Sequence, residues 1–152
     1  MRRYFVGLGF LVLIVLVATC GEQTSDTDMQ TYSDNVLLAE WTGPYGGVPA
    51  FDRMDLAALK PALEKGMELE LAEIDAIANN EDPATFVNTI EAMQGVGKDL
   101  DRVGSYRGIW SSNMSSPEFR EIQLEMAPKM AAHRTKITQN EALFERIRTV
   151  YE

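Results

Sequence analysis

A helical pattern runs through residues 59–80, whose sequence is LKPALEKGMELELAEIDAIANN. Its apolar residues follow one another at steps of four, four, three and four: Leu63, Met67, Leu71, Ile74 and Ala78. Charged residues occupy the other faces, so the spacing predicts an amphipathic helix that buries one stripe. Pro61 is tolerated in its first turn, after a short turn near residues 55–60, and Asn79-Asn80 with Pro83 predicts its end.

A second helix is predicted to start near Thr85, just downstream of Pro83. One stripe passes through Phe86, Ile90, Met93, Gly97, Leu100 and Gly104. A glycine in a helix interior costs about 1 kcal/mol relative to alanine, so close approach of another helix is a physical reason for Gly97, Gly104 and Gly108. The alternative is a weak helix with an early end.

Two more helices are predicted toward the C-terminus. Ser116-Pro117-Glu118 is a strong start signal, and it precedes a stripe through Phe119, Ile122, Met126, Met130, His133 and Ile137. Pro128 lies within that stripe, so we expect a kink or a break near Ala127. Asn140 is the expected cap of the last helix, whose inner residues are predicted to be Leu143, Ile147, Val150 and Tyr151.

The fold class that follows is mostly α, a helical bundle, because no strand-like alternation of useful length interrupts these patterns. Residues 37–54 carry Trp41, Tyr45 and Phe51 among glycines and prolines. Large apolar side chains on a flexible backbone predict an ordered loop that wraps the helical body.

The first residues indicate an export signal. Arg2-Arg3 precede an apolar run that ends at Ala18-Thr19-Cys20, which predicts a signal peptide over residues 1–19 rather than a retained transmembrane anchor. Residues 17–20 resemble a bacterial lipobox, so Cys20 is the expected lipidation site, although Thr19 departs from the usual small residue; a plain signal peptide is the alternative. Residues 20–36 are then an acylated cysteine and a flexible tether. The expected location is the bacterial cell envelope, on a membrane facing the periplasm or the exterior.

Charge and cysteine content narrow the function classes. The formal net charge is -9, and such a surface repels phosphate backbones, which argues against nucleic-acid binding. With Cys20 as the single cysteine, no internal disulfide can form, so stability must come from packing.

Hydrolytic zinc sites commonly use two histidines one helical turn apart plus a carboxylate. His133 is the only histidine, and its place on an apolar stripe predicts a packed imidazole rather than a metal ligand. The acidic residues Glu68, Glu70, Glu73 and Asp75 lack the pattern of a calcium loop, so they are interpreted as a solvated helix face.

Other site types have little support. No Gly-x-Ser-x-Gly elbow is present, and Gly95-Val96-Gly97 lacks the third glycine of a nucleotide-binding turn. Five aromatic residues are the candidate lining of a peptide groove, but core packing is the favoured interpretation: Trp41, Tyr45, Phe51, Tyr106 and Trp110.

Six segments of the chain, taken in order, resemble the N-terminal region of peptidyl-dipeptidases and related oligopeptidases of the thimet-oligopeptidase family. They are WTGPYGGVPAFD (41–52), KPALE (60–64), EIDAIANN (73–80), PATFVNTI (83–90), EMAPKMAAHR (125–134) and NEALFERI (140–147). The resemblance covers residues 37–152, which are then an incomplete N-terminal region of a larger all-α oligopeptidase.

The resemblance implies a zinc metallopeptidase whose two helical halves enclose a channel for short peptides. It implies that residues 37–152 supply helices of the channel wall, and that the zinc ligands lie in a C-terminal catalytic region. No catalytic or metal residue of this chain is therefore predicted, and the segment is expected to bind no zinc and to be inactive alone. The alternative is an autonomous acidic helical lipoprotein that binds peptides or an envelope protein.

Overall fold

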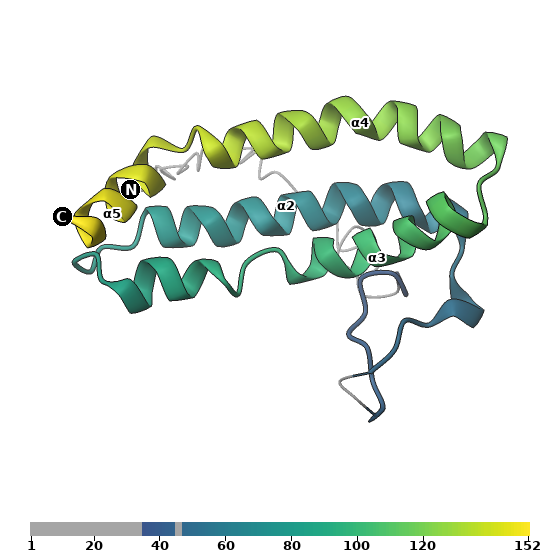
Figure 1. The fold of residues 1–152 in the computed structure, drawn as a ribbon, viewed down its shortest axis with the longest axis horizontal. Coiled ribbons are helices and arrows are strands. Elements are labelled where there is room, and N and C mark those ends of the chain that lie inside the picture. Colours follow the sequence, from purple (N-terminus) through teal and green to yellow (C-terminus); the bar gives the residue numbers. More distant parts are fainter. Residues whose placement is uncertain (1–34, 45–46) are drawn as a thin grey trace, which may run out of the picture.

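The computed structural model describes residues 35–44 and 47–152. They form the helices α2 (Leu59–Ala78), α3 (Lys98–Asn113), α4 (Pro117–Thr138) and α5 (Glu141–Tyr151). Shorter pieces are the 3₁₀ turns η2 (Phe51–Arg53) and η3 (Leu56–Ala58) and the π-helix η4 (Phe86–Glu91). Helix α2 lies between α3 and α4 and contacts α3, α4 and α5 (Figure 1). No strand occurs in the described ranges, and the predicted mostly-α class is confirmed.

Helix α2 is built as its sequence predicts. Asp55 accepts a hydrogen bond from the amide of Ala57 and starts η3, and Pro61 then lies in the first turn of α2. The helix ends at the cap residue Asn79. Leu63, Met67, Ile74 and Ala78 are buried, so the predicted stripe is the buried face of the central helix.

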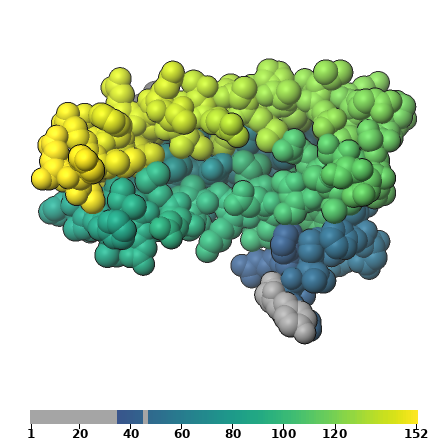
Figure 2. All heavy atoms as spheres, viewed as in Figure 1, coloured from purple at the N-terminus to yellow at the C-terminus, as the bar shows by residue number. Residues whose placement is uncertain are grey.

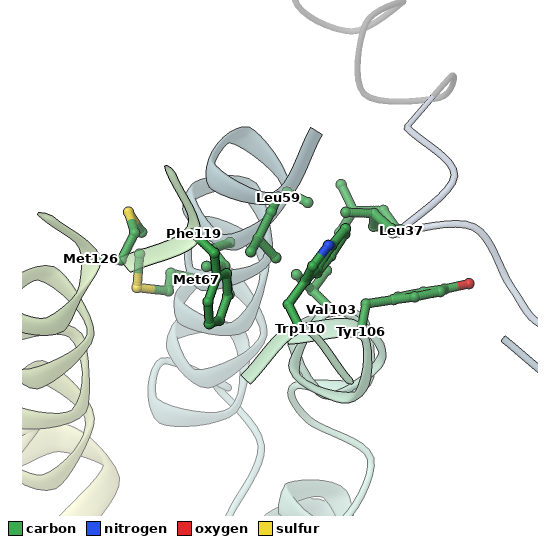
Figure 3. Close-up of a cluster of buried hydrophobic side chains, with 11 residues drawn as sticks. Leu37, Leu59, Met67, Val103, Tyr106, Trp110, Phe119 and Met126 are labelled. Carbon is green, nitrogen blue, oxygen red and sulfur yellow. The ribbon is translucent and has the colours of Figure 1, made fainter. Parts of the chain in front are cut away.

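The main core lies between α2, α3, α4 and the N-terminal loop. Leu59 and Met67 of α2 lie beside Phe119 of α4 (Figure 3). On the other side, Val103, Tyr106 and Trp110 of α3 pack toward Leu37 of the loop; all but one of the labelled residues in this cluster are less than 5% exposed. Spacings of three and four residues place these α3 side chains on one face.

The N-terminal loop is anchored on Tyr106, which is fully buried. The Tyr106 hydroxyl accepts a 2.7 Å hydrogen bond from the amide of Ala50, and its ring makes edge contacts with Trp41 and Phe51 at centroid distances of 6.3 and 6.4 Å. The predicted wrapping loop is confirmed, while Tyr45 lies outside the described residues.

Asn35 and Val36, the last residues of the predicted tether, pack on the helical body. The Asn35 side chain donates a 3.1 Å hydrogen bond to the carbonyl of Ala58. The predicted signal peptide, Cys20 and the rest of the tether lie outside the described residues. In the part of the chain that the structure describes, no helix has the length and apolar character needed to span a bilayer.

The predicted second helix is wrong in its continuity. Thr85 does start it, because its hydroxyl accepts a 3.2 Å hydrogen bond from the amide of Asn88 in a reciprocal cap. A turn at residues 94–97 then separates η4 from α3, and Gly97 has a left-handed backbone with φ +79°. Phe86, predicted in the buried stripe, is 60% exposed.

The expected reason for the glycines is also wrong for two of them. A Cβ at Gly104 or Gly108 would meet no atom within 4 Å, so no described helix approaches them. The close approach occurs at Gly66 of α2, where a Cβ would lie 3.0 Å from the Cα of Leu100 in α3. Gly66 thus permits the tight contact between α2 and α3.

Helix α4 begins as predicted, with the Ser116 hydroxyl accepting a 3.1 Å hydrogen bond from the amide of Phe119. The predicted break at Pro128 does not occur, since α4 is continuous through it. The carbonyl that Pro128 leaves without an intrahelical donor belongs to Leu124, which is 77% exposed, so water can satisfy it.

Helix α5 starts at its predicted cap, where Asn140 accepts a 2.9 Å hydrogen bond from the amide of Leu143. Leu143 joins Ile74, Ile77 and Ala78 of α2 in a second, smaller core. Tyr151, predicted to be inside, is 91% exposed, because α2 ends before that turn of α5.

Candidate functional site

A groove of about 830 Å³ lies between α3 and α4, with α2 as its floor. In Figure 2 it lies between the yellow-green atoms of α4 and the green atoms of α3. Both helices pack on α2, and this shared support leaves the space between them open. The groove thus joins residues of all three helices.

Apolar side chains make up much of the inner surface of this groove. Leu63 of α2, Leu100 of α3 and Met130 and Ile137 of α4 line it. Small residues, Gly104 and Ala131, lie on the two walls, so another backbone can approach closely there. Such a lining suits an apolar ligand or a packed polypeptide.

The side chains of Glu70 and His133 are in hydrogen-bond contact within the groove lining. The Nε2 atom of His133 and the Oε2 atom of Glu70 are 2.6 Å apart, and His133 is 8% exposed. The prediction of a packed imidazole is thus confirmed. The prediction that Glu70 is a solvated carboxylate is wrong, because α4 packs over this part of α2 and brings His133 to it.

The other members of that acidic run behave differently. Glu73 accepts a 2.8 Å hydrogen bond from the amide of Gly97 and so holds the turn before α3. Glu68 and Asp75 are exposed, as predicted. Glu73 is exposed as well, so three of the four carboxylates lie on the surface as predicted, and Glu70 is the one that is partly buried.

Arg107 lies on α3 between the groove and a smaller cavity of about 170 Å³. Its Nε atom is buried, and no described residue accepts a hydrogen bond from it. A cation with a buried and unpaired donor is costly, so Arg107 is a candidate binding group for an anion. Sequence reasoning missed Arg107, whose signal was its position directly after the buried Tyr106.

A network of exposed ion pairs links α2 and α4 away from this pair. Glu125 accepts from the ammonium groups of Lys60 at 2.5 Å and Lys129 at 3.1 Å, and Lys129 also pairs with Glu64 at 2.5 Å. Hydrogen bonds from Lys60 and then Lys129 lower the pKa of Glu125, while those to Glu64 and then Glu125 raise the pKa of Lys129. These charges satisfy one another, which is typical of a structural contact.

The described residues do not fit the zinc site that the resemblance implies for a whole enzyme. They contain no group of three or more histidine, cysteine or acidic side chains able to hold a metal ion. His133 is committed to Glu70 through Nε2, and its Nδ1 atom is buried without a partner in the described ranges. No step of zinc chemistry can be assigned to these side chains.

The five aromatic residues are candidates for a peptide groove only as the less favoured interpretation, and most of those described lie in or against the main core. Tyr106 and Trp110 are buried in the main core, and Trp41 and Phe51 contact Tyr106 edge to face. The favoured interpretation as core is confirmed for Tyr106 and Trp110, and Trp41 packs partly buried against them, but it is wrong for Phe51, which is 52% exposed.

No protein-family model matches the chain. Dipeptidyl carboxypeptidase of Salmonella typhimurium is 31% identical to it over 120 residues, which are 79% of this chain and 18% of that protein. The Escherichia coli dipeptidyl carboxypeptidase is 31% identical over 118 residues, 78% of this chain and 17% of that protein. The chain thus spans less than a fifth of the length of these curated relatives, and it is related to a segment of dipeptidyl carboxypeptidase.

Proposed function

We propose that this chain is the N-terminal segment of a secreted zinc oligopeptidase that releases C-terminal dipeptides from short peptides. The observation that carries the proposal is the 31% identity over 120 residues to dipeptidyl carboxypeptidase. The helical body around α2 supports it, since the family that the chain resembles is largely helical. Within such an enzyme, these helices form part of the channel wall and restrict substrates by size.

The zinc ligands and the catalytic base belong, in this proposal, to the remainder of the enzyme. The pairing of His133 with Glu70 supports this division, because the one imidazole of the chain serves to join α2 and α4. The contribution of the segment is therefore shape, through the positions of α3 and α4 on α2.

A chimera tests the proposal. The matched segment of the Salmonella typhimurium enzyme is replaced by the matched residues of this chain, and release of dipeptides from a short peptide is measured. We expect the chimera to bind zinc and release dipeptides, whereas the 152-residue chain alone does neither. A chimera that folds but releases no dipeptide contradicts the proposal, as does one tightly held zinc per isolated chain.

The proposed location is the bacterial envelope, with Cys20 as the lipidated residue. Its support is the sequence of residues 1–20, a charged start and an apolar run that ends at the only cysteine. Cells that express the chain are grown with a labelled fatty acid. We expect label on the wild-type protein and none on Cys20→Ser; equal labelling of the two contradicts lipidation at Cys20.

A further inference from the structure

The walls of the groove between α3 and α4 have an unfilled position at Gly104. A Cβ built there would meet nothing within 4 Å, whereas at Gly66 it would lie 3.0 Å from Leu100. Gly104 lines the groove, opposite the α4 wall that carries Ala131 and Arg134. The contrast shows that α2 and α3 use a glycine for close packing, while the groove side of α3 has no described partner.

The three helices are arranged like three members of a four-helix bundle. Helix α2 is the floor, α3 and α4 are the walls, and the position opposite α2 is open. Helices in such bundles pack at interaxial distances of about 8–10 Å when small residues and apolar rows face one another. Leu100, Met130 and Ile137, each partly buried, supply the apolar row for a fourth helix, above the fully buried Leu63.

The charges of the groove favour a carboxylate on that fourth helix. Arg107 has a buried Nε atom with no acceptor in the described ranges, and Arg134 also lines the groove. Glu70 is already bonded to His133, and Asp101 is exposed at the rim. A carboxylate can accept two parallel hydrogen bonds from a guanidinium group, so an aspartate or glutamate on the incoming helix satisfies Arg107.

We infer that the groove receives an amphipathic helix from the part of a longer peptidase chain outside this segment, with a carboxylate of that helix bound to Arg107. The inference rests on the proposed function, because the matched segment is only 18% of its relative and the occupant is taken from the remainder. Gly104 then serves as the point of closest approach between α3 and the docked helix.

The first test fills the groove. Gly104→Leu is introduced into the 152-residue chain and into the chimera, and the Tm of each is measured. In the chain alone the added Cβ meets no atom within 4 Å and leucine favours the helix, so Tm is unchanged or raised. In the chimera it blocks the docked helix, and Tm falls by about 5 °C.

Gly108→Leu is the matched control. Gly108 is one turn further along α3, its Cβ would also meet nothing within 4 Å, and it does not line the groove. We expect this substitution to leave the Tm of the chimera unchanged. Equal effects of the two substitutions in the chimera overturn the inference.

The second test concerns the charge. Arg107→Met removes an unpaired buried donor in the 152-residue chain, so its Tm stays the same or rises, while in the chimera Tm falls because a carboxylate loses its partner. Arg102→Met is the control on the same helix. The Arg102 guanidinium already donates to the carbonyl of Leu38 and pairs with Asp99, so this variant lowers Tm in both proteins.

Other occupants give different results. A 152-residue chain that sediments as a dimer, and becomes a monomer on Gly104→Leu, assigns the groove to a second copy and overturns the inference. Variants of the chimera that keep Tm but raise KM for the peptide assign it to substrate, which also overturns it. A wild-type chimera that folds without activity contradicts the proposed function alone; one that does not fold contradicts both.

Discussion

Glu70 and His133 show how one side-chain pair joins two helices. The two residues are 63 positions apart in the chain, and each lies on a helix that also carries apolar core residues. Packing of Met67 and Met126 in the same core places α2 and α4 side by side. Glu70 and His133 can then hydrogen-bond to each other between the two helices. The pair thus stabilises the arrangement that opens the groove.

Removing the carboxylate is expected to leave His133 buried without a partner. Glu70→Ala should lower the free energy of unfolding by about 1–3 kcal/mol, the cost of an unsatisfied buried polar group. Glu68→Ala, on the exposed face of the same helix, should change it by less than about 0.5 kcal/mol. Urea unfolding measures both, and equal losses would show that the pair contributes no more than a surface carboxylate.

At the scale of the elements, the turn before α3 depends on Gly97. Its φ of +79° disfavours residues with a Cβ, and a Cβ there would lie 2.9 Å from the Oε1 atom of Glu70. Its amide is held by Glu73. Glu73 of α2 therefore helps to fix where α3 begins, and with it the positions of Val103, Tyr106 and Trp110.

Two glycine substitutions, one in the turn before α3 and one within α3, should change the free energy of unfolding in opposite directions. Gly97→Ala should lower the free energy of unfolding by at least about 1–2 kcal/mol, because of its left-handed backbone and the contact with Glu70. Gly104→Ala should raise it by up to about 1 kcal/mol, because alanine favours a helix interior and meets no neighbour. Thermal unfolding of both variants measures these changes. A Gly97→Ala variant that is more stable than the wild-type protein would contradict the role of the turn.

The start of α4 predicts a pH dependence. A hydrogen bond from its own backbone amide and one from Ser116 lower the pKa of Glu118 below 4.5. A carboxyl group whose pKa falls on folding stabilises the protein above its unfolded pKa, and this contribution is lost as pH falls through the folded value. Glu118→Gln should thus be less stable than the wild-type protein near neutral pH, and the difference should vanish in strong acid.

Urea unfolding as a function of pH measures this difference. Glu121→Gln, further along α4 and away from its first amides, is the control and should show a smaller effect near neutral pH. A gap between Glu118→Gln and the wild-type protein that persists in strong acid would assign the effect to something other than the charge.

On the scale of the whole molecule, α2 carries two separate cores. The larger one joins its first half to α3, α4 and the N-terminal loop, and the smaller one joins its last turns to α5 through Leu143. Arg146 of α5 donates to the carbonyls of Asn80 and Asp82 at 2.6 and 3.0 Å, which ties α5 to the end of α2. Two cores along one helix allow one end to open before the other.

Leu143→Ala should loosen the α5 end first. We expect a loss of about 2–5 kcal/mol at this buried site, with hydrogen exchange faster over residues 141–151 than over α3. Phe144→Ala is the control, since Phe144 is 60% exposed and its removal should change stability by about 0.5 kcal/mol or less. Equal acceleration of exchange in all helices would show a single cooperative unit.

Local patterns were enough to predict most of the elements. Pro61, Ser116 and Asn140 mark helix starts through the geometry of their own first turns, and the apolar stripes of α2 and α4 recur at helical spacing. These signals depend on residues a few positions apart, so they predict a helix without knowledge of what that helix packs against.

The features that local patterns did not predict depend on contacts between residues far apart in the sequence. Glu73 of another helix holds the turn at Gly97, the buried His133 is bonded to Glu70, and Tyr151 is 91% exposed. The groove exists because α3 and α4 both pack on α2, and the same packing buries the Nε atom of Arg107 without an acceptor in the described ranges. No local spacing records such an arrangement, since its free energy comes from side chains that meet only when the helices have packed.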